Sequence, residues 1–343
     1  MRQTFDLFRF VVILSLLFIF SAHAENEDAS TEKREAQSWL KKVQAAAQSL
    51  NYSGTFVYQQ ASQMRTSRIT HVLDGKNEIE KLEILDGKPR EYIRNNEEVI
   101  FYVPEAKTLL VEKRITHDIF PAILPANPSV LSESYEVRKD ATGRVAGHDC
   151  QVIVLEPKDK LRYGYKLWAD KSTGLLLRAQ TLNEKREVVE QISFTQIAIG
   201  NIDRSSVKPG FSNTSGWHVE NATMSQASLS GWTVKSLPPG FKKIREVKRL
   251  ISDTPATGGA AAGMQASAPL NRREVSQMVF SDGLAAISVF IEPGSQSRTE
   301  GSMQQGAMHI IGKRYGDFWL TIVGEVPYAA IRQVADSIEF KSK

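Results

Sequence analysis

A histidine, an aspartate and a cysteine adjoin at His148, Asp149 and Cys150, the arrangement in this chain that most suggests covalent catalysis. A thiol becomes a nucleophile when an imidazole takes its proton and a third group orients that imidazole. On a strand His148 and Cys150 share a face and flank Asp149, so no third group orients the pair. We therefore expect no catalytic role. Cys150 is the single cysteine, and a small buried hydrophobe is favoured over a redox or intermolecular thiol.

Other residue types that perform catalysis lack the spacing that catalysis needs. Neither a G-x-S-x-G elbow nor a glycine-rich phosphate loop occurs. Further histidines are scattered without the spacing of a zinc site: His71, His117, His218 and His309. We therefore predict no metal, no cofactor and no enzymatic activity.

Positive charge gathers in the last third of the chain. Five cations lie within residues 242–249, where Glu246 alone opposes them, and two more follow at 272 and 273. The cations are Lys242, Lys243, Arg245, Lys248, Arg249, Arg272 and Arg273. Such a run is either a solvated face or a binding site for an anionic partner, such as an acidic protein segment or a phosphorylated lipid headgroup.

Apolar and aromatic residues recur at alternate positions in several predicted strands, which indicates a sheet with one apolar face. Ten of them are candidates to line a pocket: Phe56, Tyr58, Ile69, Ile100, Tyr102, Tyr163, Tyr165, Leu167, Ile192 and Phe194. This face is either ordinary core or, in part, an open cavity for acyl chains, since long apolar ligands need a concave apolar site.

A helix and an antiparallel meander would hold these positions. Apolar residues at three- and four-residue spacing predict a helix over residues 32–50. Runs rich in β-branched and aromatic residues, divided by turn signals such as Asp74-Gly75, predict the strands. They lie at 52–60, 66–73, 79–85, 90–94, 99–103 and 108–112, with three more between 144 and 200. The proline-punctuated residues 115–132 predict a loop that closes over the apolar face or packs as a connector.

Residues 208–216 are rich in turn formers and predict a linker between a domain at 25–207 and another at 217–343. In the second domain, residues 241–251 fit strand or helix, and strand is favoured. Hairpins are predicted at 274–292 and 308–323, and a closing helix at 327–338. Residues 252–269 are rich in glycine, alanine, serine and proline and predict a mobile loop.

The first 24 residues have the form of a secretory signal peptide. Arg2 and Arg9 supply positive charge, residues 10–20 form an apolar core, and Ala22-His23-Ala24 fits a cleavage site. The apolar core is about half of the ~20 residues that span a bilayer, so cleavage is favoured over an uncleaved anchor. We expect a soluble periplasmic protein. The net charge of +4 is too mild to indicate nucleic acid.

Five runs, in this order, resemble the RseB/MucB family of periplasmic regulators. They are LNYSGTFVYQQ (50–60), DCQVIVLEP (149–157), YKLWADKSTGLLLR (165–178), VFSDGLAAISVFIEP (279–293) and FWLTIVGEVP (318–327). The resemblance covers nearly the whole mature chain. It implies an α+β fold, with a LolA-like antiparallel half-barrel and covering helices followed by a smaller C-terminal α+β domain. The family has no short active-site signature, so no single functional residue is carried across.

The resemblance also implies a function. The chain would be a negative regulator of an extracytoplasmic stress sigma factor, binding the periplasmic segment of a membrane-anchored anti-sigma factor and shielding it from a site-1 protease. A lipid or lipopolysaccharide-derived signal would release it, and a homodimer is left open. The alternative is a periplasmic lipoprotein or lipid carrier, against which the whole second domain argues. A periplasmic hydrolase is the third and weakest reading.

Overall fold

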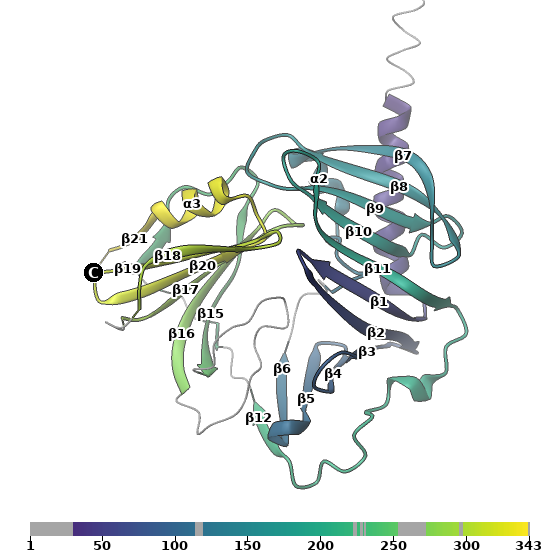
Figure 1. The fold of residues 1–343 in the computed structure, drawn as a ribbon, viewed down its shortest axis with the longest axis horizontal. Helices are drawn as coiled ribbons and strands as arrows, with labels where there is room; N and C mark the ends of the chain where they lie inside the picture. The colour runs from purple at the N-terminus through teal and green to yellow at the C-terminus, as the bar shows by residue number, and fades with distance from the viewer. Residues whose placement is uncertain are drawn as a thin grey trace, which may run out of the picture.

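The structure is a computed structural model of the 343-residue chain that describes residues 30–113, 119–221, 225–226, 229, 231–252, 272–294 and 298–341. Two large sheets organise these residues, and Figure 1 shows them side by side. The predicted signal peptide lies outside the described residues, and so does the predicted mobile loop beyond residue 252. No helix in the described ranges is long and apolar enough to cross a membrane.

The first sheet has twelve strands in the order β12-β6-β5-β4-β3-β2-β1-β11-β10-β9-β8-β7. They are β1 Tyr52–Gln60, β2 Gln63–Asp74, β3 Asn77–Ile84, β4 Arg90–Asn95, β5 Glu98–Val103, β6 Thr108–Lys113, β7 Tyr135–Val145, β8 His148–Pro157, β9 Gly164–Asp170, β10 Leu176–Leu182, β11 Val188–Ile199 and β12 His218–Asn221. Two meanders, β1–β6 and β7–β11, join where β1 pairs with β11, and β12 adds to β6 in parallel. This long-range pairing makes one curved sheet of two local units.

A helix, described over residues 30–49, and short helical turns accompany this sheet. Ala36, Leu40 and Val43 are fully buried or nearly so and pack into the same core as strand residues of β1 and β9. The short turns are η1 Pro104–Ala106, η2 Pro128–Val130, α2 Leu131–Ser134 and η3 Arg204–Val207. The three- and four-residue apolar spacing thus becomes the stripe that covers the sheet.

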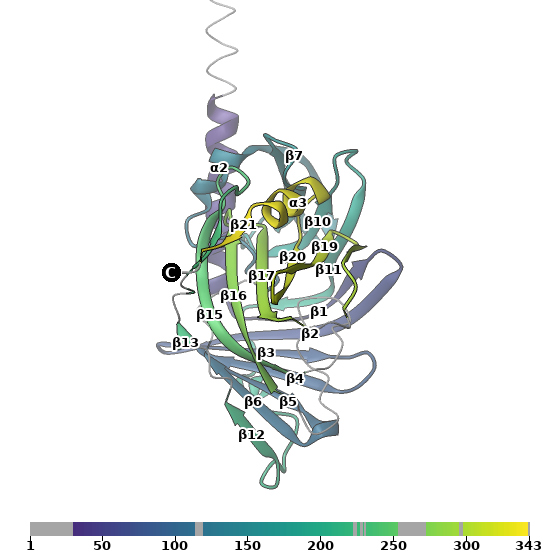
Figure 2. The ribbon, with the colours of Figure 1, turned by 90° about the vertical axis from the view of Figure 1, so that its left-hand side faces the viewer.

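The second sheet has seven strands in the order β13-β15-β16-β17-β20-β19-β18. They are β13 Ser225–Gln226, β15 Lys242–Ser252, β16 Arg272–Ser281, β17 Ala286–Pro293, β18 Gly301–Gln305, β19 Met308–Tyr315 and β20 Phe318–Gly324. The helix α3 Tyr328–Asp336 lies across its upper part (Figure 2), and β14 Trp232–Val234 pairs with β21 Ile338–Phe340. Ile331 and Val334 of α3 pack on Met278 and Leu320 in a separate core.

The fold class expected from the sequence, an antiparallel half-barrel followed by a smaller α+β unit, is confirmed, and residues 242–252 form a strand. The predicted linker is packed rather than loose, because the Gly210 N–H donates to Glu91 and Phe211 stacks on Tyr102. After this segment, residues 218–221 pair in parallel with β6 of the first sheet. The turn-forming composition predicted that the chain bends at residues 208–216. It did not predict that Gly210 and Phe211 contact strands of the first sheet.

Candidate functional site

The strand register decides which of the predicted pocket residues share a face. The ladder of directly opposed residues that begins at Ile69 on β2 reaches Phe101 on β5. Ile100 and Tyr102 adjoin Phe101 along β5 and therefore lie on the opposite face. The expectation that all ten candidates share one face is wrong for these two. Alternation within one strand does not fix its parity relative to distant strands, which depends on every intervening turn.

Seven of the other candidates share the covered face by register, and Tyr163 immediately precedes β9. The seven are Phe56, Tyr58, Ile69, Tyr165, Leu167, Ile192 and Phe194. All but Tyr58 and Ile192 are buried, and those two are half-buried and stand directly opposite each other on β1 and β11. This pair is therefore the most accessible point of the predicted pocket.

The loop after β6 closes over the apolar face. Phe120 places its ring 5.6 Å from the Phe56 ring and 5.0 Å from the Phe194 ring, and Leu124 joins the same core. Of the two alternatives for this proline-punctuated segment, the structure has the closing loop. Most of the face is thus packed core, and an acyl chain that enters it must displace Phe120 or the helix over residues 30–49.

At one end of this face, β1 and β11 meet the turn between β18 and β19 of the second domain. Glu190 Oε1 accepts hydrogen bonds from Gln60 Nε2 at 2.6 Å and from the Ala307 N–H at 3.1 Å. Gln60 Nε2 also donates to the Gln305 carbonyl oxygen at 3.2 Å. Burial raises the pKa of Glu190, while the donors Gln60, Ala307 and Tyr58 oppose that rise. The contact is desolvated and polar, and both domains supply it.

A second contact between the domains surrounds Arg162, whose side chain is fully buried. Its Nη1 donates to Asp282 Oδ2 at 2.5 Å, its Nε to Asp159 Oδ1 at 3.1 Å, and its Nη2 to the Pro239 carbonyl oxygen. The Tyr135 hydroxyl donates to the same Asp282 oxygen at 3.3 Å. A buried guanidinium with this many acceptors fixes the loop before β9 against the β16–β17 turn.

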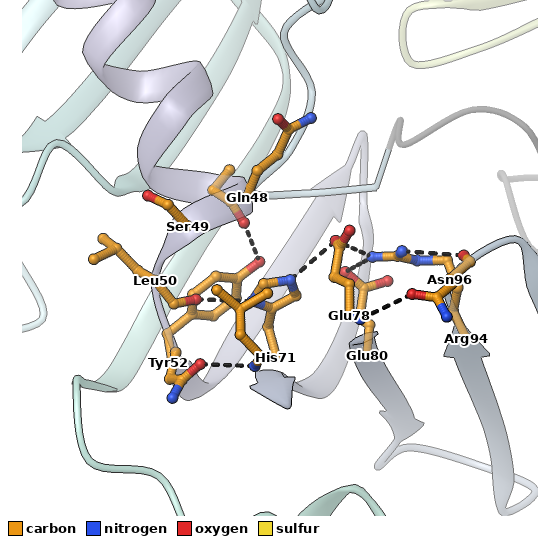
Figure 3. A network of polar contacts seen from close by, with 12 residues as sticks. Gln48, Ser49, Leu50, Tyr52, His71, Glu78, Glu80, Arg94 and Asn96 are labelled. Atoms are coloured by element: carbon orange, nitrogen blue, oxygen red, sulfur yellow. Dashed lines mark hydrogen bonds and ion pairs between the residues drawn. The ribbon is translucent and has the colours of Figure 1, made fainter. Parts of the chain in front are cut away.

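A buried network of charged side chains lies on the covered face near the end of the helix (Figure 3). His71, Glu80 and Arg94 are directly opposed on β2, β3 and β4. The two ring nitrogens of His71 each face an oxygen, Nδ1 the Leu50 carbonyl at 2.8 Å and Nε2 the Glu78 Oε1 at 3.0 Å. The Arg94 guanidinium donates to Glu78 at 2.7 Å.

Sequence reasoning missed this network. Burial raises the pKa of Glu80, whereas at Glu78 hydrogen bonds from His71 and Arg94 outweigh burial and lower the pKa to about 2. The available signal was the alternation in β3, where Glu78 and Glu80 fall at positions that an apolar face would give to hydrophobes. Their arrangement ties the helix end to three strands.

The basic run occupies β15 but does not form one face. Lys242 and Lys243 are exposed, and Lys243 pairs with Glu246. After a bulge, Arg245 and Lys248 are half-buried and fall on opposite faces of the strand by register. For Arg249, Arg272 and Arg273 only the backbone is described, on β15 and β16, with residue 273 opposite residue 251. Among the side chains of the run that the structure describes, the first two lysines are the exposed ones.

His148 and Cys150 do not form a nucleophile with its base. Cys150 is fully buried, as the sequence predicts, and its Sγ donates to the His148 carbonyl oxygen at 3.5 Å. Burial raises the pKa of the Cys150 thiol to about 11. His148 Nδ1 instead lies 3.3 Å from Oδ1 of Asp170, the last residue of β9. A thiol with such a pKa stays protonated at neutral pH and is unreactive.

Comparison with known proteins covers both sheets. The MucB/RseB N-terminal domain matches residues 35–211, and the MucB/RseB C-terminal domain matches residues 226–339. The sigma-E factor regulatory protein RseB of Haemophilus influenzae is 26% identical over 322 residues, which is 91% of this chain and 94% of that protein. The sigma factor AlgU regulatory protein MucB of Pseudomonas aeruginosa is 28% identical over 325 residues, 90% of this chain and 92% of its own length.

Solved structures agree with this similarity. The crystal structure of MucB in complex with MucA(peri) superposes with a TM-score of 0.68 at 28% identity, covering 90% of this chain and 100% of that one. The crystal structure of MucB alone gives a TM-score of 0.64 at 26% identity, over 90% of this chain and 98% of the other. The likeness spans both domains and is not limited to either sheet.

Proposed function

Because the chain belongs to the MucB/RseB family, we propose that it is a negative regulator of an extracytoplasmic stress sigma factor. It acts by binding the periplasmic segment of a membrane-anchored anti-sigma factor and keeping that segment from proteolysis. The observation that carries this proposal is the similarity over 90% of the chain to MucB in a structure that also holds MucA(peri). Both domains take part in that similarity.

Regulation by binding, without catalysis, fits the chemistry of the chain. The relatives are named as regulatory proteins, and the cysteine that most suggested catalysis has a pKa of about 11. A leader of the form that the sequence predicts directs a protein to the periplasm, where an anti-sigma factor exposes its outer segment. The carrier alternative accounts for the first sheet but gives no role to the second.

A lipidic signal is the finer part of the proposal. Its site is the covered apolar face, entered at Tyr58 and Ile192, which are half-buried and opposed. Entry deeper into the face displaces Phe120. A signal that binds the released state more tightly needs only about 1.4 kcal/mol of differential affinity for a tenfold shift in partner binding.

The basic run on β15 is the proposed contact for acidic groups of the partner. Lys242 and Lys243 are exposed at the start of the strand, and the other members follow along β15 and β16. Exposed charges of this kind steer association and fix register more than they add affinity. The proposal assigns this strand to recognition and the first sheet to the signal.

A protease-protection assay tests the function. Residues 25–343 are mixed with the periplasmic segment of the membrane-anchored anti-sigma factor from the same organism, and cleavage by the matching site-1 protease is followed over time. We expect cleavage to slow in proportion to the fraction of segment bound. Unchanged cleavage, together with capture of a lipoprotein from the envelope, would support the carrier instead.

A further inference from the structure

Within the residues that the structure describes, buried polar side chains join the two domains at two distinct places, and the chemistry of the two differs. One is the buried Arg162–Asp282 ion pair, in which both side chains are fully buried. The other is the β18–β19 turn, whose tip reaches the end of β1 in Figure 1. At the turn, a carboxylate and an amide of the first domain hold backbone groups of the second. The first contact is an ion pair with many partners, and the second rests on few hydrogen bonds.

Glu190 and Gln60 pack closely around the β18–β19 turn. Glu190 is 7% exposed, Gln60 4% and Ala307 0%. Gly306 lies between them with φ of +57°, and a Cβ there would stand 2.4 Å from Gln60 Cγ and 2.8 Å from Glu190 Oε1. Only glycine gives the turn both its left-handed backbone and this close approach. Any added atom at position 306 must push the two domains apart or move both side chains.

The same carboxylate adjoins the accessible end of the apolar face. Tyr58 is two residues before Gln60 on β1 and shares its face, and its hydroxyl opposes the rise in the pKa of Glu190 that burial causes. Tyr58 also stands opposite Ile192, two residues after Glu190 on β11. A ligand that inserts an apolar chain between Tyr58 and Ile192 therefore moves the pair that adjoins Gln60 and Glu190 on the same face. Because the Ala307 N–H donates to Glu190, the movement is transmitted to the β18–β19 turn of the second domain.

We propose that Glu190 and Gln60 form a latch on the β18–β19 turn, and that an acyl chain bound at Tyr58 and Ile192 opens it. The Arg162 contact stays closed and serves as the pivot. Opening changes the angle between the sheets without unfolding either one, because each sheet has its own core. The regulatory meaning of the latch rests on the proposed function, but its opening is a property of this chain alone.

The test measures the distance between the domains in the absence of any partner. Spin labels are placed at Lys185→Cys in the first domain and Arg332→Cys in the second, both exposed positions, while the fully buried Cys150 stays unlabelled. Gly306→Ala is compared with Gly316→Ala. Gly316 has φ of +56° and nothing within 4 Å of its Cβ position, so both variants carry the same backbone strain and only the first meets the latch.

We expect Gly306→Ala to shift the distance distribution away from that of the unsubstituted chain and Gly316→Ala to leave it in place. Should Gly306→Ala fail to fold, Glu190→Ala gives the same readout, with Glu190→Gln as its control because the amide oxygen still accepts both hydrogen bonds. Coincident distributions for Glu190→Ala and Glu190→Gln, or for the two glycine variants, would overturn the latch.

The ligand arm uses palmitate as the probe. Palmitate should shift the unsubstituted chain toward the distribution of Gly306→Ala, and Tyr58→Phe should bind palmitate with a smaller shift, because the hydroxyl that acts on Glu190 is gone. Binding of palmitate with no change in distance would overturn the coupling. If the chain shows these distance shifts but does not protect the anti-sigma segment from proteolysis, the proposed function is wrong and the latch is still supported.

Discussion

At the scale of single residues, Cys150 tests whether burial alone accounts for a lone cysteine in an oxidising compartment. Its side chain is fully buried, so Cys150→Ala should lower the free energy of unfolding by about 1 kcal/mol. Cys150→Ser should cost more, because a buried hydroxyl needs a partner. Urea denaturation of the three proteins measures both. Equal stability of the serine variant, or a loss of partner binding in the stable alanine variant, would contradict the packing role.

Glu78 makes the stability depend on acid in a defined window. Hydrogen bonds from His71 and Arg94, acting against burial, lower its pKa from 4.5 to about 2 in the folded chain. A carboxyl with a depressed folded pKa contributes stability above its unfolded value and loses it as the pH falls toward the folded one. Glu78→Gln should therefore be less stable than the unsubstituted chain at neutral pH.

The difference between the two proteins should shrink as the pH falls from about 4.5 to about 2. The raised pKa of Glu80, caused first by burial, acts in the opposite direction, but it is present in both proteins and largely cancels. Urea midpoints across that range measure the difference. A gap that stays constant down to the lowest pH would show that Glu78 keeps no depressed pKa.

At the scale of the element, the loop after β6 decides whether the apolar face is core or cavity. Phe120 is 4% exposed and touches the rings of Phe56 and Phe194, so Phe120→Ala should cost about 3 kcal/mol or more. It should also raise the binding of an environment-sensitive hydrophobic dye, because the face is then less covered. Val130→Ala is the control, since Val130 is 38% exposed. A Phe120→Ala protein as stable as the control would mean that the loop does not seal the face.

The strand β15 carries the prediction on partner binding. Lys242→Glu with Lys243→Glu reverses two exposed charges without touching the buried Val247, so folding should persist. Binding of the acidic segment should weaken, and unsubstituted binding should fall with added salt, as exposed charge contacts do. Isothermal titration at two salt concentrations measures both effects. Lys160→Glu with Lys185→Glu is a matched reversal on the first domain. An equal loss in that control would show a general charge effect rather than a site on β15.

Local elements were predictable from the sequence because their signals are local. Alternation and turn residues predicted β1 and β2, the hairpin of β16 with β17, and the helix α3, all near their observed bounds. The face of the sheet on which Ile100 and Tyr102 lie was not predictable, because it depends on the register at each turn from β2 to β5. The buried charges at Glu80 and Arg94 were also missed, since single-strand alternation does not show that two opposite charges stand opposed.

At the scale of the whole molecule, the contacts between the domains join residues far apart in sequence. Glu190 meets Ala307 and Arg162 meets Asp282, and no local pattern marks these as partners. What the sequence does show is a segment rich in turn formers at residues 208–216, from which two units were predicted. Buried polar contacts join the two units, and apolar packing adds to them, because Leu284 packs against the core of the first unit and Leu161 against that of the second.

The ion pair at the pivot should contribute more to the orientation of one unit on the other than to either core. Arg162→Met leaves Asp282 buried without its cation, and removal of one partner of such a pair costs about 3–5 kcal/mol. Asp282 still accepts hydrogen bonds from the N–H groups of Leu284 and Ala285, so the β16–β17 turn should keep its shape. Hydrogen exchange should therefore quicken at residues 158–163 and 236–241, while the strands of both sheets stay protected.

The double variant Arg162→Met with Asp282→Asn is compared with Arg162→Met, because it also removes the unpaired buried charge. The double variant should recover part of the lost stability and still exchange faster at the interface than the unsubstituted chain. If the single variant instead loses protection throughout the second sheet, Arg162 supports the core of that domain, and the pivot assigned to it is wrong. If neither variant changes exchange at the interface, the domains are held in place by the latch at Glu190 and not by this ion pair.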